Sequence, residues 1–502
     1  MQNTLLKIEN LSKVFGGVRA LDAVSLTINK GEIHCLAGEN GSGKSTLIKV
    51  VSGFYKPEGG VITIDGKQYG SLSITNAIRL GIQVIYQDFS IFPNLTVAEN
   101  IAMNYELYNR KKLVSWSKVR EIAQESMNHI GISIPLEEKV ENLSVADKQL
   151  VAIARSILYN ARLIIMDEPT SALTRKEVDK LFRVVRQLQN EGVSILFVSH
   201  KLDEVFEIAD KFTVLRNGKL IVTDDAQNID SEKFIYYMTG RKIEEEYYVP
   251  EAIDQEHTLF EVRNLYLKNG FEGISFAIHA GEILGITGLL GSGRTELAKA
   301  LFGLYTIDMG SIYVDGEEVQ IKTPQDAIRH RIAYVPEDRL TEGLFLSQSV
   351  KNNLVVSHID ALLRWGRLDR RRMDAQAAKW IDELAIKVHK LEDPIQTLSG
   401  GNQQKAVLGK WLGTSPRVLI LNGPTVGVDI GSKFDIHAFL RELAARAEMA
   451  IIIISDDISE VLKNCNRILI IDKGRITGEY ANTELNEHSL MQRVTAGEVE
   501  EA

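Results

Sequence analysis

The segment Gly38-Glu39-Asn40-Gly41-Ser42-Gly43-Lys44-Ser45-Thr46 follows the pattern G-x-x-x-x-G-K-[ST], which is the spacing of a phosphate-binding loop. A short apolar run at 32–37 precedes it and predicts a buried strand, and residues 47–51 predict a helix. The three glycines let the backbone curl, so that successive N–H groups face a polyphosphate at the positive end of the helix. We therefore expect Lys44 to reach the β- and γ-phosphates and the Ser45 hydroxyl to coordinate Mg²⁺.

The chain has 502 residues, which is too long for one compact core and predicts at least two domains. Its composition, 44% hydrophobic and 25% charged, is typical of a soluble globular protein. The net charge of −9 argues against a general nucleic-acid binder, which would carry a basic excess. No apolar run is long enough to span a bilayer and the first residues form no signal peptide, so we expect a cytoplasmic protein. Cys35 and Cys465 both lie in apolar runs and are expected to be buried, reduced thiols in strands.

The second half of the chain repeats the motifs of the first at an offset of about 250 residues. The loop at 38–43 returns at 288–293, and Leu143-Ser144 returns as Leu398-Ser399. This predicts a duplicated domain, with copies at 1–240 and 259–502 joined by an acidic linker at 241–258. Apolar runs alternate with amphipathic stretches in each copy, which predicts an α/β fold with a largely parallel sheet. Residues 100–150 and 350–397 interrupt this alternation and predict one inserted helical subdomain per copy.

Four polar side chains follow apolar runs in the first copy. Asp167 and Glu168 end the run 163–166, where Asp167 suits Mg²⁺ binding and Glu168 suits polarising an attacking water. Gln87 ends a shorter run, and His200 follows the run 194–198. Each of these alone is commonly a solvated or structural residue, so they carry weight only beside the phosphate loop.

Together the loop, Gln87, Leu143-Ser144, Asp167-Glu168 and His200 resemble the motif set of ATP-binding-cassette (ABC) ATPases. The resemblance implies two tandem P-loop nucleotide-binding domains with ATP and Mg²⁺ as cofactors. It implies that Gln87 contacts Mg²⁺, that His200 holds the γ-phosphate and that Phe15 stacks on adenine. The catalytic residues it implies are Lys44, Gln87, Glu168 and His200, with Ser45, Gln87 and Asp167 as metal ligands.

In that family ATP sits between one copy's phosphate loop and the other copy's signature segment, so the two sites are assessed crosswise. The expected ATP-binding residues are Phe15, Gly38, Glu39, Asn40, Gly41, Ser42, Gly43, Lys44, Ser45 and Thr46 with the second copy's signature, Ser399, Gly400, Gly401 and Asn402. The first copy's signature is altered to Ser144-Val145-Ala146-Asp147, which fits either an N-capped helix or a weak ATP contact. The second copy's own site is degenerate, with Gly288, Gly293, Arg294, Thr295, Glu337, Asn422, Gly423 and Asp456 at the matching positions.

The intact motifs belong to one crosswise site and the altered motifs to the other. This distribution resembles that of one branch of the ABC ATPases, the fused double-cassette subunits of bacterial importers for simple sugars of the ribose, galactose and xylose type. Second copies in that branch usually keep an Asp-Glu pair, so Asn422-Gly423 is a departure. The resemblance implies an ATPase that energises solute import at the cytoplasmic face of the inner membrane. It implies as partners a permease, expected as a dimer, and an extracytoplasmic solute-binding protein. The alternatives are a soluble duplicated ABC ATPase acting on ribosomes or DNA, which the short acidic linker disfavours, and a regulatory nucleotide sensor.

Overall fold

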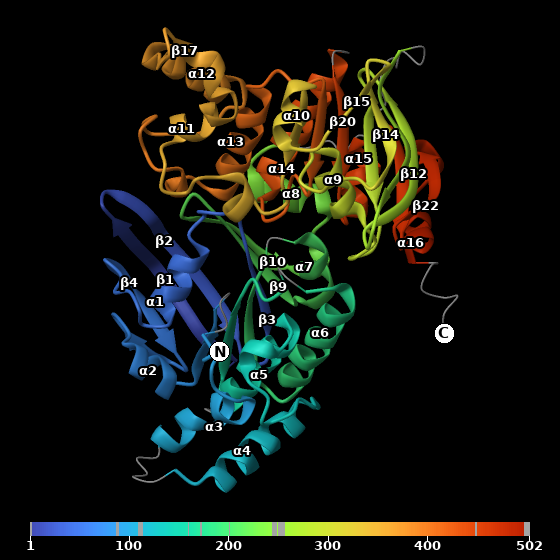
Figure 1. Cartoon of the computed structure of the whole chain (residues 1–502). Helices are drawn as coiled ribbons and strands as arrows, with labels where there is room; N and C mark the ends of the chain where they lie inside the picture. Colours follow the sequence, from blue (N-terminus) through green and yellow to red (C-terminus); the bar gives the residue numbers. More distant parts are fainter. Residues whose placement is uncertain are drawn as a thin grey trace. The chain divides into compact units, whose positions relative to one another are not determined.

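The computed structural model describes residues 3–86, 90–108, 114–158, 160–170, 173–199, 201–242, 248, 257–446 and 449–495, and side chains of 103–108 fall outside the described set. The chain divides into two compact units, Met1–Ile243 and Glu244–Ala502. Figure 1 colours the first unit from blue to green and the second from yellow-green to red. The predicted linker, 241–258, lies for the most part outside the described residues.

The first unit is built on a six-stranded, mostly parallel sheet that carries the phosphate loop. Its strand order is β10 (Lys219–Asp225), β9 (Lys211–Arg216), β3 (Ile33–Ala37), β8 (Ser194–Val198), β7 (Leu163–Asp167) and β6 (Ile82–Ile85). Strands β3, β6, β7, β8 and β9 run parallel, and β10 is antiparallel. The carboxyl ends of the parallel strands therefore meet at one edge, where ligands bind in open α/β sheets.

A second, antiparallel sheet of four strands packs against this one, and the sequence did not predict it. Its order is β2 (Val18–Asn29), β1 (Thr4–Phe15), β4 (Gly59–Ile64) and β5 (Lys67–Tyr69). Residues such as Leu163 and Ile165 face the core that the two sheets share, while Ile164 and Met166 face a second core on the helical side. Both faces of the central sheet are therefore buried, which explains the unbroken apolar runs.

Helices cover the remaining faces of the first unit (Figure 1). They are α1 (Lys44–Val51), α2 (Ile74–Arg79), α3 (Val97–Tyr108), α4 (Trp116–His129), α5 (Val145–Ile157), α6 (Arg175–Asn190), α7 (Leu202–Ile208) and α8 (Ser231–Thr239). Helices α3 to α5 pack together in the region predicted as a helical subdomain. Helix α6 starts at a capping box in which Thr174 and Glu177 satisfy each other's backbone N–H groups.

The second unit repeats this plan. Its six-stranded sheet has the order β16 (Ile332–Val335), β19 (Val418–Asn422), β20 (Ala450–Ile454), β13 (Ile283–Thr287), β21 (Arg467–Asp472) and β22 (Arg475–Ala481). Its antiparallel sheet consists of β12 (Phe271–His279), β11 (Thr258–Leu267), β14 (Met309–Val314) and β15 (Glu317–Val319). The helices are α9 (Arg294–Leu301), α10 (Pro324–Arg329), α11 (Val350–Val355), α12 (Arg370–Glu383), α13 (Gly400–Leu412), α14 (Ile430–Ala445), α15 (Ile458–Asn464) and α16 (Glu487–Thr495), and a hairpin of β17 (Leu363–Arg364) and β18 (Arg367–Leu368) precedes α12.

Both cysteines are buried and neither forms a disulfide. The sequence predicted a strand for each; Cys35 does lie in β3, but Cys465 directly follows α15 and belongs to no strand. Burial raises the pKa of both thiols, which disfavours their reactive thiolate form at neutral pH. Among the helices that the structure describes, none combines the length and apolar character needed to cross a membrane.

Candidate functional site

The first phosphate loop joins β3 to α1 in a conformation that only glycine tolerates at two positions. Gly43, the N-cap of α1, has φ +109°, and a Cβ there would lie 2.6 Å from the Ala20 carbonyl oxygen. A Cβ on Gly38, with φ +155°, would lie 2.3 Å from the carbonyl oxygen of Leu215. The loop therefore fits closely against its surroundings because two of its residues have no side chain.

Two side chains of this loop are arranged to meet a phosphate. Lys44 is buried, and its Nζ donates to the carbonyl oxygens of Gly38 at 2.6 Å and Glu39 at 3.1 Å. The Ser42 hydroxyl is buried and has no hydrogen-bond partner among the described residues. Gly43 has no side chain with which to cap α1, and the loop lies at the positive end of this helix. These features fit a bound polyphosphate.

The paired carboxylates stand at the end of β7, at the sheet edge that carries the loop. Burial, and then the neighbouring Glu168 carboxylate, raise the pKa of Asp167, while Lys44 and Lys49 oppose the shift. A divalent cation would relieve the same repulsion, so this donor set fits Mg²⁺. Glu168 has a left-handed backbone, with φ +48°, and its N–H donates to the Val198 carbonyl at 3.1 Å. Such a conformation is unfavourable for a residue with a side chain and is often found at functional sites.

Gln87 and His200 lie outside the described residues. The strands that precede them are described and end beside β7, with Ile85 paired to Met166 and Val198 paired to Asp167. Phe15 ends β1 with a partly exposed ring that meets Tyr55 edge-on at 5.0 Å between ring centroids. Lys13 Nζ lies 5.1 Å from the centroid of the Phe15 ring.

In the second unit, Arg294 takes the place of Lys44. Its guanidinium donates to the Gly288 carbonyl at 2.6 Å, just as Lys44 donates to Gly38, and Gly293 caps α9 with φ +98°. Arg294 also forms an ion pair at 3.6 Å with Asp456, which follows β20. The sequence predicted both replacements, but their pairing becomes visible only in the fold.

The end of β19 has no carboxylate. Asn422 is buried, and its Nδ2 has no hydrogen-bond partner among the described residues. Gly423 has φ +58°, and its N–H donates to the Ile454 carbonyl at 2.8 Å, so its backbone matches that of Glu168. A cavity of about 340 Å³ opens here. Its lining residues are Thr295, Lys299, Tyr334, Glu337, Asp338, Arg339, Leu340, Glu342, Asn422, Val426 and Gly427.

The second unit's signature segment starts α13, and close packing requires a glycine at Gly401. A Cβ on Gly401 would lie 2.0 Å from Ser432 Oγ, and one on Gly400 would lie 2.9 Å from an Arg339 guanidinium nitrogen. Ser399 does not cap the helix with its side chain; its Oγ accepts a bond of 2.8 Å from the Asn402 amide. The Ser399 hydroxyl thus remains at the helix start without binding the helix backbone.

The first unit's altered signature is an N-capped helix, one of the two alternatives open from the sequence. Ser144 Oγ accepts from the Asp147 N–H at 3.1 Å and donates to the Asp147 carboxylate at 3.0 Å. The serine hydroxyl is therefore engaged by its own helix, and a negative charge stands beside it. This arrangement is unfavourable for a phosphate at the same place.

Sequence reasoning missed the hydrogen bonds that three basic residues, Arg339, Lys410 and Arg155, donate to backbone carbonyl oxygens. Arg339 donates to the carbonyl oxygens of Val426 at 2.8 Å and Gly427 at 3.2 Å, which links the segment after β16 to the loop after β19. Lys410, near the end of α13, donates to the Gly343 carbonyl at 2.6 Å, and Arg155 of α5 donates to Ser90 at 2.8 Å. Arg155 and Lys410 occupy matching positions of the two copies, and this repeated basic residue is the signal from which their contacts could have been inferred.

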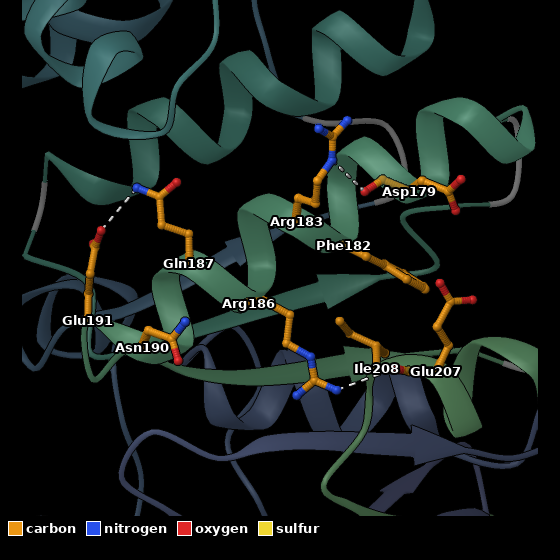
Figure 2. Close-up of a pocket in the computed structure, with 9 residues that line it drawn as sticks. All are labelled: Asp179, Phe182, Arg183, Arg186, Gln187, Asn190, Glu191, Glu207 and Ile208. Carbon is orange, nitrogen blue, oxygen red and sulfur yellow. Dashed lines mark hydrogen bonds between the residues drawn. The ribbon is translucent and has the colours of Figure 1, made fainter.

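A groove of about 660 Å³ lies between α6 and α7 of the first unit, as Figure 2 shows. Polar side chains of the groove bind neighbouring protein groups: Arg186 donates to the Glu207 carbonyl at 3.2 Å, and Gln187 donates to the Glu191 carboxylate at 3.1 Å. None of the predicted site residues lines this groove. It is therefore separate from the phosphate loop.

The family model described as ABC transporter matches residues 21–171 and 271–426. The two matches include both phosphate loops and the ends of β7 and β19. They cover more than half of the chain, and the second repeats the first.

Several relatives match this chain over almost its whole length. A ribose import ATP-binding protein of Bacillus cereus is 39% identical over 495 residues, covering 98% of this chain and 100% of that protein. A second ribose import ATP-binding protein, from Streptomyces avermitilis, is 39% identical over 491 residues, covering 98% and 97%. A xylose import ATP-binding protein of Geobacillus kaustophilus is 41% identical over 508 residues, covering 99% and 100%. With two matching cassettes and relatives of this identity over its whole length, the chain belongs to the ABC transporter family.

Proposed function

We propose that this chain hydrolyses ATP to energise the import of a simple sugar or a related small polar solute through a membrane permease. Hydrolysis takes place at the first cassette. The observation that carries the proposal is the meeting of Lys44, Asp167 and Glu168 at one edge of the six-stranded sheet, beside a glycine loop shaped for a polyphosphate. The second cassette lacks both carboxylates at the matching strand end.

In the first cassette, some residues bind the nucleotide and Mg²⁺, and Glu168 takes part in proton transfer. The loop N–H groups and Lys44 bind the β- and γ-phosphates and hold the γ-phosphate in place. Mg²⁺, held by Ser45, Gln87 and Asp167, would neutralise charge on the phosphate oxygens. Glu168 accepts a proton from the attacking water, and His200 orients the γ-phosphate. Phe15 provides an aromatic face for the adenine base.

By the family resemblance, the second cassette's signature, Ser399 with the backbone of Gly400 and Gly401, would bind the γ-phosphate of an ATP held on a first cassette, of the same chain or of a second copy. Support comes from the contrast between Ser399, whose hydroxyl does not cap α13, and Ser144, whose hydroxyl caps α5.

The proposed partners rest on the relatives, which are import ATP-binding proteins for ribose and xylose. An import subunit of this kind would act from the cytoplasmic face of the inner membrane as a peripheral protein. It would dock on permease subunits, and an extracytoplasmic binding protein would deliver the solute to them. The acidic net charge of −9 gives no support to a nucleic-acid partner.

The test is purification of the tagged chain from membranes, followed by reconstitution of the complex in liposomes. We expect a permease to co-purify, and we expect ATP-dependent uptake of labelled ribose, xylose or galactose. Glu168→Gln should retain the permease and ATP binding but lose uptake and hydrolysis. Glu207→Gln, in the separate groove of Figure 2, is the matched control and should behave as the parent. Parent-level hydrolysis by Glu168→Gln would refute the assignment of the catalytic site.

A further inference from the structure

We propose that the hairpin of β17 and β18, together with the start of α12, binds the anionic headgroups of a phospholipid bilayer. Figure 1 shows β17 at an outer corner of the second unit, beside α12. The turn of the hairpin, Trp365-Gly366, would enter the boundary between headgroups and acyl chains, while nearby arginines bind the phosphates. The proposal rests on the proposed function in one respect, because it gives a chain that works at a membrane face a direct contact with lipid.

The tip of the hairpin carries a residue that its backbone disfavours. Trp365 has φ +54° and Gly366 has φ +74°, so φ is positive at both turn positions, as in a type I′ turn. Asparagine and glycine are preferred in such turns, whereas a bulky side chain is strained there. Trp365 gains little from its own chain in return, since it is 93% exposed. A strained and exposed indole fits a residue that makes its contact outside the chain.

The strands of the hairpin bring two like charges together. Arg364 pairs directly with Arg367, and like charges at opposite positions destabilise an antiparallel pair. The other pair of the hairpin is Leu363 with Leu368, and both leucines are exposed. Because successive side chains of a strand point to opposite faces, the hairpin has one basic face and one apolar face. It is therefore amphipathic.

Three more arginines occupy the first turn of α12, where a helix disfavours positive charge and where no acidic residue is present. Asp369 caps this helix by accepting the N–H groups of Arg371 at 3.0 Å and Arg372 at 3.3 Å. Its carboxylate also lies 3.9 Å from Arg372 Nε. Within the part of the chain that the structure describes, the other four arginines have no ion pair. All five are exposed, and we call them the basic cluster: Arg364, Arg367, Arg370, Arg371 and Arg372.

These features are unfavourable in the free chain and become favourable at an anionic bilayer. Lipid phosphates would neutralise the facing arginines and would lie at the positive end of α12. Tryptophan prefers the boundary between headgroups and acyl chains, because its ring is apolar and its N–H is polar. A projecting turn suits a broad surface, and the leucines beside it fit the apolar layer. We therefore favour a bilayer over an acidic protein segment as the partner.

The experiment measures co-sedimentation of the purified full chain, without permease, with lipid vesicles. We expect binding to vesicles of equal parts phosphatidylcholine and phosphatidylglycerol, little binding to pure phosphatidylcholine, and release at high salt. Arg364→Gln combined with Arg367→Gln should weaken the binding on the order of ten-fold or more, because each basic residue near an anionic surface contributes roughly five-fold. Arg329→Gln combined with Arg475→Gln is the matched control. It removes two exposed, ion-paired arginines of the same cassette and should bind as the parent does.

A second variant separates binding from folding. Trp365→Asn should also weaken vesicle binding, because it removes the indole. The same change should raise the melting temperature, since asparagine suits the positive φ of this turn. A loss of binding in a more stable protein cannot result from unfolding.

Three outcomes would overturn the proposal: no preference of the parent for anionic vesicles, parent-like binding by either hairpin variant, or an equal loss in the matched control. Loss of permease co-purification together with parent-like vesicle binding would assign the hairpin to an acidic protein segment instead. Failure here leaves the proposed function untouched, because vesicle binding is measured without ATP and without permease. Failure of the proposed function would instead appear as hydrolysis that survives Glu168→Gln.

Discussion

Glu168 and Gly423 occupy matching places after β7 and β19, and both have a left-handed backbone, with φ of +48° and +58°. Each N–H donates to the last residue of the neighbouring strand, Val198 in one cassette and Ile454 in the other. Glycine adopts this conformation without strain, whereas a residue with a Cβ is destabilised by roughly 1–2 kcal/mol. The first cassette therefore keeps a carboxylate where the backbone favours glycine, which fits a residue retained for function.

The first prediction separates activity from stability at this position. Glu168→Gly and Glu168→Gln should both reduce ATP hydrolysis by about 10²–10⁴-fold, because both remove the proton acceptor. Both also remove the charge that helps to raise the pKa of Asp167. Only glycine adopts the left-handed backbone conformation at this position without strain. The free energy of unfolding should therefore be higher for Glu168→Gly than for Glu168→Gln, by up to about 1 kcal/mol. Urea unfolding of the two variants measures this, and a glycine variant clearly less stable than the glutamine variant would contradict it.

The second prediction concerns the two signature serines. Ser399→Arg should abolish ATP hydrolysis, since a bulky cation would fill the space of the γ-phosphate contact, while Ser144→Arg should leave most of it. Stability should follow the opposite order. Ser144 caps α5, so its loss should cost about 1 kcal/mol, whereas Ser399 caps no backbone group with its side chain.

Hydrolysis rates of both serine variants, reconstituted with the permease, and their melting temperatures check this prediction. Ser144→Ala serves as a control, because it removes the cap without adding a cation. Equal losses of hydrolysis in the two arginine variants would refute a single active site and favour two coupled sites.

The third prediction tests the ion pair between Arg294 and Asp456. Asp456 is largely exposed and neutralises part of the positive charge of the second phosphate loop. Asp456→Asn should therefore strengthen nucleotide binding at the second site, by no more than about five-fold, because exposed ion pairs contribute at most about 1 kcal/mol. Titration with a fluorescent ATP analogue in a Lys44→Ala background measures the change. The gain should shrink at high salt, and unchanged affinity at low salt would count against the pair.

Much of the fold can be predicted from the spacing of apolar residues along the sequence. Where this prediction fails, particular residues explain why. The runs at 163–166 and 194–198 are buried on both faces, so they could be recognised as central strands of a parallel sheet. The antiparallel sheet was not predicted from the sequence, because β1 has several bulges that disturb its alternation of buried and exposed residues. The strained backbone at Glu168 could have been inferred from Gly423, its glycine counterpart in the repeat. The pairing of Arg294 with Asp456 could not, because it depends on where β20 ends relative to the loop.

The last prediction concerns a buried lysine and the pH dependence of stability. Lys410 is 5% exposed, donates to the Gly343 carbonyl and lies 5.0 Å from the centre of the Trp411 ring. Burial lowers its pKa from 10.5 to about 8. Between these two values the unfolded chain binds a proton that the folded chain has lost, so folding stability rises with pH across this window and is flat below it.

Relative to Lys410→Met, the parent should therefore gain about 1–2 kcal/mol of unfolding free energy between pH 7.5 and 9.5. Tryptophan fluorescence during urea unfolding suits the measurement, because Trp365, Trp380 and Trp411 all belong to the second cassette. Lys410→Arg provides the control: it keeps a cation that does not titrate in this range, so its stability should follow that of the methionine variant with pH. Parallel profiles for the parent and both variants would show that Lys410 titrates normally. In that case burying the charged Lys410 ammonium beside the Gly343 carbonyl would not reduce the free energy of unfolding.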